Sequence, residues 1–264
     1  MSPAGLHDDR IKVEIRGPVM EITFDHLPAH AVNQKFSRDL TAAIQRLEDD
    51  ADLRCAIVTA TGERIFCAGW DLKSVAMGET GEDFGAYGFM GLRRNDQRKP
   101  VICAVNGLAV GGGFEFALGA QIVLCAPDSE FGLPELQRGF IPEAGALWRA
   151  HRRLPHNIAS ELLLTGRRLT AEEGLRLGFV NRIVPRGQLM DAAREIAARI
   201  CASAPLAVAA YLEVLEHVEG KSDRQAWETL YSQLPARGRM RGSDDFHEGA
   251  RAFAEKRAPV WKGR

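Results

Sequence analysis

Glu115 is the only charged residue between Lys99 and Asp128, in a stretch that is otherwise nearly all apolar. It stands two residues after the glycine triplet Gly111-Gly112-Gly113. A buried carboxylate is costly unless it has a partner or a chemical role. Three glycines at a helix start can offer bare N–H groups to a small ligand oxygen. Because close strand–helix packing explains them equally well, the triplet alone indicates no ligand.

A second turn of the same kind is predicted in the segment Phe66-Cys-Ala-Gly-Trp-Asp-Leu-Lys73. Two such turns from separate segments can aim two N–H groups at one oxygen, which is an oxyanion hole. A further acid, Glu135, ends the segment Phe131-Gly-Leu-Pro-Glu135. A partly buried carboxyl with a raised pKa exchanges protons near neutrality. Glu115 and Glu135 beside such a hole are predicted to remove a proton and deliver a hydroxyl group, or the reverse.

Other common chemistries have little support in the sequence. The pattern Gly-x-x-x-Gly-Gly-Gly at 107–113 fits neither G-x-G-x-x-G nor the P-loop. The five cysteines are odd in number and show no C-x-x-C spacing, so we expect reduced thiols rather than a disulfide framework or a zinc site. His26 and His30 lack an accompanying H-E-x-x-H pattern, so no metal is predicted.

Charge and segment composition limit the partners. The formal net charge of −1 gives no electrostatic argument for nucleic acid or an anionic membrane. Basic clusters at 93–99 and 149–153 are predicted to be solvated faces or anion contacts. Glycines and polar residues interrupt the apolar run at 101–126, which argues against a membrane span. The first ten residues lack the layout of a signal peptide, so we predict a cytoplasmic protein.

The elements that must position these residues alternate between strands and helices. Alternating residues on either side of Gly17-Pro18 predict a hairpin, and Asn33 is a predicted helix cap. Strand, turn and helix follow one another three times, which is typical of an α/β fold. The predicted strands are 13–16, 19–24, 55–60, 101–105 and 122–126, with one that begins at Ile65 and leads through a turn into a helix by Lys73, and a further short one that ends within 129–135. The predicted helices are 156–165, 170–177, 188–203, 205–236 and 241–257, with another starting near Gly112.

Several segments together resemble the signature blocks of the crotonase (enoyl-CoA hydratase/isomerase) superfamily, over residues 12–264. The resemblance implies a spiral of repeated ββα units at 1–200, which binds acyl-CoA and carries the catalytic site. It also implies a helical C-terminal region at 201–264 that builds trimers or paired trimers. The matching segments are 66–73, 105–115, 130–135, 164–173, 178–184 and 252–257.

The resemblance also implies roles for individual residues. The amides of Trp70 and Gly112 would hold the thioester oxygen, and Glu115 and Glu135 would be the acid/base pair. Coenzyme A would enter as part of the substrate, with no separate cofactor. Its binding residues would be Ala68, Asp71, Leu72 and Lys73, with Lys256 reaching the CoA phosphates, in a neighbouring subunit if not in the same one.

Some positions narrow the resemblance or depart from it. The segments 68–73, 83–85 and 259–264 are most similar to the carnitinyl-CoA dehydratase branch of the superfamily. A quaternary ammonium substrate favours an aromatic wall, for which Trp70, Phe84, Tyr87 and Trp148 are candidates. Glu143 stands where many hydratases have glycine, so it is a candidate third acid. An acid near the dipole of a helix start explains Glu143 equally well.

The sequence therefore predicts an acyl-CoA hydro-lyase that adds or removes water at the α,β bond of a thioester. The nearest alternative is an isomerase that moves the double bond, for which one carboxylate would suffice. An alternative of another class is a non-catalytic homologue that binds CoA or RNA. The identity of the acyl group is left open.

Overall fold

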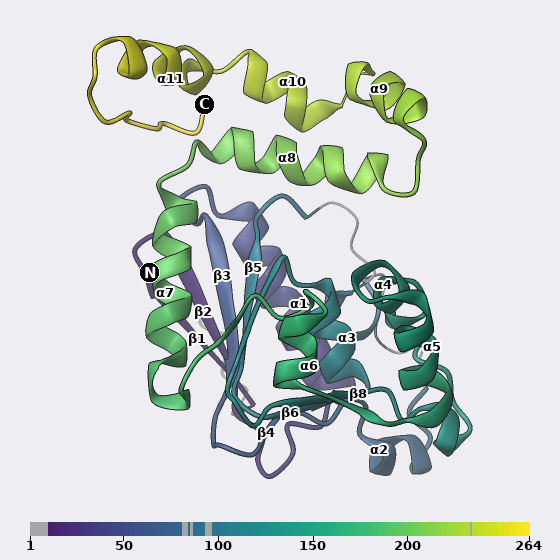
Figure 1. Ribbon diagram of the computed structural model, residues 1–264. Coiled ribbons are helices and arrows are strands. Elements are labelled where there is room, and N and C mark those ends of the chain that lie inside the picture. The colour runs from purple at the N-terminus through teal and green to yellow at the C-terminus, as the bar shows by residue number, and fades with distance from the viewer. Residues whose placement is uncertain (1–9, 81–83, 85–86, 93–96, 233) are drawn as a thin grey trace.

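The computed structural model describes residues 10–80, 84, 87–92, 97–232 and 234–264. Its strands form two sheets, and β4, β6 and β8 of the smaller sheet run across the view near the lower end of the larger one (Figure 1). The larger has the strand order β1-β2-β3-β5-β7-β10 and the smaller the order β4-β6-β8-β9. β1 pairs antiparallel with β2, and β8 with β9, while all other neighbours are parallel. The strands are Ile11–Arg16, Val19–Phe24, Cys55–Ala60, Ile65–Cys67, Val101–Val105, Leu108–Val110, Ile122–Cys125, Glu130–Gly132, Arg168–Thr170 and Arg182–Ile183.

Consecutive strands are shared between the two sheets in a regular way. β3, β5 and β7 enter the larger sheet, and the strand that follows each of them, β4, β6 or β8, enters the smaller one. A helix comes after each such strand pair, so the chain winds as a spiral of ββα units. The helices are α1 (Gln34–Asp49), α2 (Leu72–Ala76), α3 (Gly112–Gly119), α4 (Ala146–Arg153), α5 (His156–Thr165), α6 (Ala171–Arg176) and α7 (Leu189–Cys201). The predicted α/β class is confirmed.

Aromatic packing holds the spiral together. Phe24 contacts Phe36, Phe66 and Phe116, with ring centroids 5.2–5.9 Å apart. Further along, three buried rings pack mutually at 5.0–5.3 Å and fix α3 against the smaller sheet: Phe114, Phe131 and Phe179. Such contacts bury large apolar areas and favour edge-to-face geometry. The start of α3, which carries Glu115, therefore rests on a rigid base.

The C-terminal helices form a layer of their own beside the spiral (Figure 1). The sequence predicts one helix over 205–236, but the chain bends twice there. Gly220, at a φ of +74°, ends the first helix, and a capping box at Ser222 starts the next. The predicted last helix is also shorter than expected. The observed helices are α8 (Pro205–Val218), α9 (Asp223–Tyr231), α10 (Pro235–Arg241) and α11 (Asp244–Ala254).

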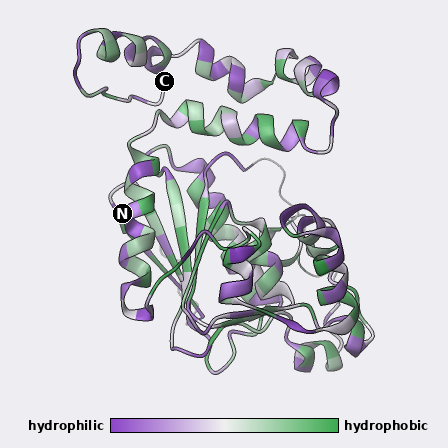
Figure 2. Cartoon of the chain, viewed as in Figure 1, coloured by the Kyte–Doolittle hydropathy of each residue, from purple (hydrophilic) through white to green (hydrophobic). Residues whose placement is uncertain are grey.

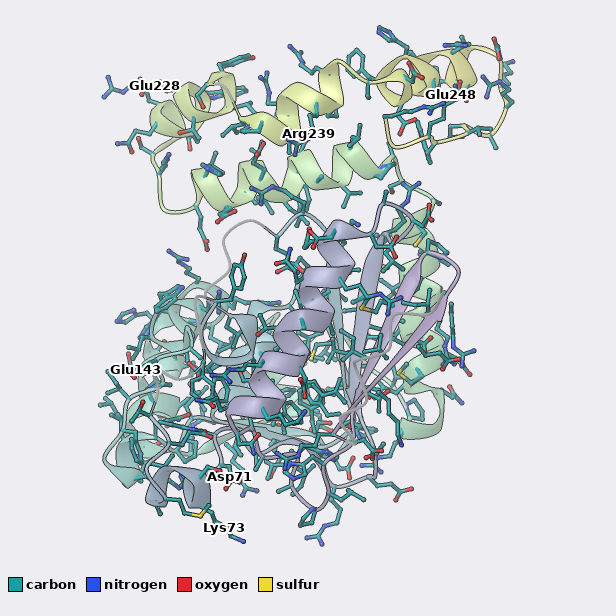
Figure 3. All side chains as sticks on the ribbon, turned by 180° about the vertical axis from the view of Figure 1, so that it is seen from behind. Asp71, Lys73, Glu143, Glu228, Arg239 and Glu248 are labelled. Carbon is teal, nitrogen blue, oxygen red and sulfur yellow. The ribbon has the colours of Figure 1, made fainter. Side chains whose placement is uncertain are left out.

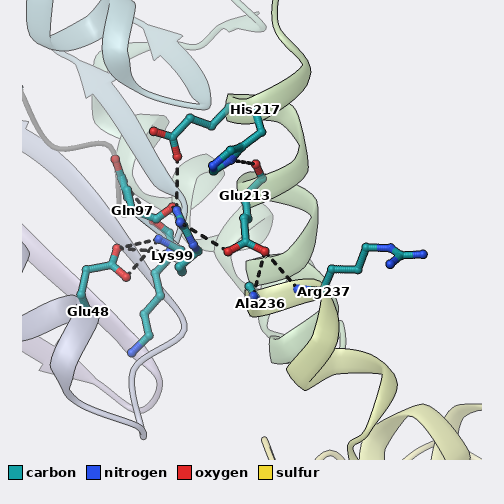
Figure 4. A network of polar contacts seen from close by, with 9 residues as sticks. Glu48, Gln97, Lys99, Glu213, His217, Ala236 and Arg237 are labelled. Carbon is teal, nitrogen blue, oxygen red and sulfur yellow. Dashed lines mark hydrogen bonds and ion pairs between the residues drawn. The ribbon is translucent and has the colours of Figure 1, made fainter. Parts of the chain in front are cut away.

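A buried acid joins this layer to the spiral (Figure 4). The Glu213 carboxylate accepts hydrogen bonds from the N–H groups of Ala236 (2.8 Å) and Arg237 (3.1 Å) at the start of α10. It also pairs with the Arg98 guanidinium at 3.7 Å, just before β5. The backbone N–H of Arg98 in turn donates to the Glu48 carboxylate on α1, at 3.0 Å. Glu213 thus holds α8, α10 and the edge of the spiral in one arrangement.

Apolar residues are spread over both parts of the chain (Figure 2). No single helix of the described residues is long and apolar enough to cross a membrane. By length and composition alone, one pair bent by 100° passes the same test, Arg186–Cys201 with Pro205–Val218.

Candidate active site

A cavity of about 590 Å³ lies where four segments of the spiral meet. One side is formed by the β4–α2 turn and by Phe84, Phe89 and Leu92, and another by the start of α3. The loop at 134–144, between β8 and α4, closes it. Residues from four predicted site segments therefore share one space. Those lining it are Ala68, Trp70, Leu72, Gly112, Glu115, Glu135 and Glu143.

Glu115 lies in the first turn of α3 and is only 4% exposed. Its Oε1 accepts a hydrogen bond from the Ala146 N–H, at 3.0 Å. Burial raises the pKa of Glu115 to about 7, and the nearby negative charge of Glu135 contributes to the rise. At neutral pH this carboxyl is therefore able both to accept and to donate a proton.

Arg149 on α4 fixes the loop that holds Glu115. Its guanidinium donates to the carbonyl of Ala144 at 3.1 Å and to that of Leu92 at 2.9 Å. It packs so closely on Gly145 that a Cβ there would come within 2.4 Å of its Nη1. Arg149 thus ties residues 144–146 to the opposite wall of the cavity.

The Glu135 carboxyl lies against the glycine triplet Gly111-Gly112-Gly113. A Cβ on Gly111 would lie 2.7 Å from the Glu135 Oε1, so the carboxyl rests directly against this turn. Its Oε2 is buried and has no hydrogen-bond partner among the described residues. Burial raises the pKa of Glu135 to about 6. An unsatisfied buried carboxyl oxygen is unusual in a native protein and typical of a functional site.

The two predicted oxyanion amides lie next to each other. A Cβ on Gly69 would meet the Gly112 nitrogen at 2.8 Å. Gly112 is the first residue of α3, so its N–H has no partner inside the helix. The Val32 N–H donates to the Gly69 carbonyl at 2.8 Å, and the Val32 carbonyl accepts the Asp71 N–H at 2.9 Å. Peptide groups alternate in direction along an extended strand, so the Trp70 N–H points away from Val32.

Four aromatic rings follow one another along the cavity, and we call Trp70, Phe84, Phe89 and Phe140 the aromatic wall. Two of them were candidates from the sequence. The other two candidates, Tyr87 and Trp148, do not line the cavity. Phe89 and Phe140 were missed, because neither belongs to a periodic pattern. The resembling segment 83–85 falls largely outside the described residues.

The predicted CoA residues divide into three groups. Ala68 and Leu72 line the cavity. Asp71 caps α2 by accepting the Lys73 N–H at 3.0 Å, and both lie on the same side of the molecule as Glu143 (Figure 3). Lys256 follows α11, which lies at the opposite end of the chain's fold. A role for Lys256 in a neighbouring subunit stays a prediction.

Two arginines of the basic cluster at 149–153 donate to backbone carbonyls of the fold, which corrects the prediction of a solvated face or an anion contact for this cluster. Arg149 serves the loop described above. Arg153 donates to the carbonyls of Ala117, Leu118 and Ala120 at 2.6–3.4 Å, and so satisfies the end of α3. Only Arg152 behaves as expected, in an exposed pair with Glu219. No cluster of metal-binding side chains occurs in the described part of the chain.

Comparisons with known proteins identify the family of the chain. The model of the enoyl-CoA hydratase/isomerase family matches residues 14–264. The carnitinyl-CoA dehydratase of Proteus mirabilis is 48% identical over 252 residues, covering 94% of this chain and 97% of the relative. That of Salmonella typhi is 46% identical over 251 residues, covering 94% and 96%.

Solved structures show the same architecture. The enoyl-CoA hydratase of Mycobacterium tuberculosis superposes with a TM-score of 0.89 at 40% identity, covering 97% of this chain and 100% of the other. The enoyl-CoA hydratase of Bacillus anthracis gives 0.87 at 30% identity, with the same coverage. The chain therefore belongs to the enoyl-CoA hydratase/isomerase family, and the predicted crotonase-like spiral is confirmed.

Proposed function

We propose that this protein is an acyl-CoA hydro-lyase that interconverts a β-hydroxyacyl thioester and the corresponding enoyl thioester. The supporting observation is that the buried carboxyl of Glu115 and the partly buried carboxyl of Glu135 share one cavity with Trp70 and Gly112, whose amides would hold the thioester oxygen. Water addition needs both a base and an acid, and it also needs a place for negative charge on the thioester oxygen.

The reaction uses the two carboxyls in opposite protonation states. In hydration, the ionised carboxyl takes a proton from a water molecule while the oxygen of that water bonds to Cβ. The electrons of the double bond move towards the thioester oxygen, where the Trp70 and Gly112 N–H groups stabilise the enolate. The protonated carboxyl then gives its proton to Cα. Elimination of water reverses each step, and the balanced reaction requires no separate cofactor.

The proposal also covers the chemical class of the acyl group. The relatives from Proteus and Salmonella are named carnitinyl-CoA dehydratases. We assign this chain the same substrate class, a short acyl group that ends in a quaternary ammonium. Asp71 and Lys73 would bind the CoA portion together with Ala68 and Leu72, which line the cavity.

The C-terminal region has a separate proposed role. Residues 1–200 would carry out the reaction, and residues 201–264 would hold subunits together as a trimer or a pair of trimers. Large apolar side chains on the C-terminal helices support this division, because Trp227 is 59% exposed, Tyr231 70% and Phe253 88%. A cytoplasmic location stays a prediction.

Turnover of a panel of CoA thioesters tests the activity. Purified full-length protein is incubated with crotonobetainyl-CoA, crotonyl-CoA and a β,γ-enoyl-CoA, and products are separated by mass. The proposal expects gain of water on the α,β-enoyl thioesters. Movement of the double bond without gain of water would support the isomerase instead. Binding of CoA without turnover of any member would support a non-catalytic homologue.

A further inference from the structure

The aromatic wall is a continuous and rigid surface. The ring centroids of Phe140 and Trp70 are 6.3 Å apart, those of Trp70 and Phe84 5.7 Å, and those of Phe84 and Phe89 5.0 Å. The Trp70 indole N–H donates to Glu79 at 2.9 Å, which fixes the orientation of that ring. Phe89 reaches the oxyanion turn, since a Cβ on Gly112 would meet its ring at 2.2 Å.

Glu143 lines the same cavity as an exposed carboxylate. No described residue forms a hydrogen bond or an ion pair with it. The single basic side chain among the described lining residues is Arg138, whose guanidinium donates to the Pro134 carbonyl at 2.9 Å. The described lining thus holds three carboxyls and one cation. The Glu143 carboxylate has no partner of opposite charge among the described residues.

Chain connectivity keeps Glu143 close to the reacting carbons. It precedes Ala146, whose N–H holds the Glu115 carboxyl, by three residues. Three residues span at most about 11 Å even when fully extended. The far end of a short acyl group whose Cα and Cβ lie at Glu115 is therefore within reach of Glu143.

We propose that Glu143 and the aromatic wall form a subsite for the cationic end of the acyl group, and that Glu143 acts there as a charge partner rather than in proton transfer. Aromatic faces attract a quaternary ammonium, and a carboxylate supplies the compensating charge. A quaternary nitrogen has no N–H, so ring faces and charge are the means to recognise it. An uncharged alkyl end would cover Glu143 without compensation. The inference rests on the proposed hydro-lyase function.

A pair of substrates isolates the charge. Crotonobetainyl-CoA is compared with its neutral isostere, in which a carbon replaces the ammonium nitrogen to give a tert-butyl end. Wild-type protein is expected to show a higher kcat/KM for the cationic thioester. In Glu143→Gln the kcat/KM for the cationic thioester falls, and the preference for it declines by about tenfold. Glu143→Asp retains most of the preference. The control Glu172→Gln removes an exposed acid on α6, outside the cavity, and changes neither value.

Two outcomes would overturn the subsite. Equal loss of kcat on both substrates in Glu143→Gln would make Glu143 a proton-transfer group. Equal kcat/KM of wild-type protein for both substrates would mean that no cation is recognised. Phe140→Leu keeps a similar apolar volume but removes one ring face, so it should also lower the preference selectively. Hydration of crotonyl-CoA is measured in parallel. If it persists while the preference is absent, the subsite fails and the hydro-lyase function stands.

Discussion

Glu115 shows how one residue combines a cost to stability with a use in chemistry. Burial raises its pKa in the folded chain, whereas the unfolded chain titrates near the ordinary value of 4.5. Between these two values the folded protein binds more protons than the unfolded one. The contribution of Glu115 to stability is therefore present below a pH of about 4.5 and declines as the pH rises through about 7.

The variant Glu115→Gln should lack this decline. The difference between a pKa of about 7 and 4.5 corresponds to about 3 kcal/mol. Relative to wild type, we therefore expect the variant to gain up to about this amount of unfolding free energy between pH 5 and pH 8.5. Urea unfolding at the two pH values measures it, with Glu172→Gln as the control. A stability difference that does not change with pH would contradict the assignment.

The site residues that stand in short sequence motifs were the most predictable from the sequence. Glu115, Glu135, Trp70 and Gly112 were predicted to converge, and all four line one cavity. Their catalytic roles stay predictions. Phe140 could not be foreseen, because it reaches the cavity from an irregular loop whose path depends on tertiary packing.

At the scale of elements, the contact between two turns decides the position of the oxyanion amides. Gly69 has a φ of +78°, and a Cβ there would lie 2.8 Å from the Gly112 nitrogen and 2.9 Å from the Val110 carbonyl oxygen. Both neighbours are backbone atoms, so they cannot move without shifting the start of α3. The β4–α2 turn and the β6–α3 turn are thus fitted to each other.

We expect Gly69→Ala to lower the hydration rate by about 10²-fold or more, as does loss of one oxyanion donor. Gly17→Ala is the matched control, because Gly17 also has a positive φ, +57°, with nothing within 4 Å of a Cβ. The control should lose about 1–2 kcal/mol of stability and keep its rate. Steady-state kinetics and urea unfolding of both variants separate the effects. Equal rates in the two variants would count against the fit of the turns.

Most elements that escaped prediction share physical causes. α4 begins at Ala146 after Gly145, which provides no side-chain cap, so the sequence contains no start signal. β6, β9 and β10 have two or three residues, too few for an alternating pattern. The break near Gly220 does carry sequence signals, a glycine at a helix end and a capping box at Ser222, so the prediction of one helix over 205–236 was wrong for no physical reason. Longer elements with clear caps, such as α1 after Asn33, were predicted correctly.

On the scale of the whole molecule, the C-terminal layer exposes the apolar side chains that an assembly would cover. Trp227 and Tyr231 stack at a centroid distance of 6.0 Å on the surface of α9. Two large exposed rings next to each other favour an interface rather than open solvent. Association of subunits through Trp227 and Tyr231 can be measured independently of catalysis.

The double variant Trp227→Glu, Tyr231→Glu should therefore dissociate the assembly. Wild-type protein is expected to have the mass of a trimer or a hexamer by light scattering, and the variant a smaller mass at the same concentration. Leu164→Glu is the control, because Leu164 is 70% exposed on α5 in the spiral and should leave the mass unchanged. A monomeric wild type would refute the proposed role of residues 201–264.

Glu115 and Glu135 are proposed to act together in adding water to, or removing it from, the α,β bond of an acyl-CoA. The most direct measurement follows crotonobetainyl-CoA in isotopically labelled water, with wild-type protein and the separate variants Glu115→Gln and Glu135→Gln. We expect one labelled oxygen in the wild-type product, and rates lower by about 10²–10⁴-fold in each variant. Wild-type rates in both variants, or a product without labelled oxygen, would contradict it.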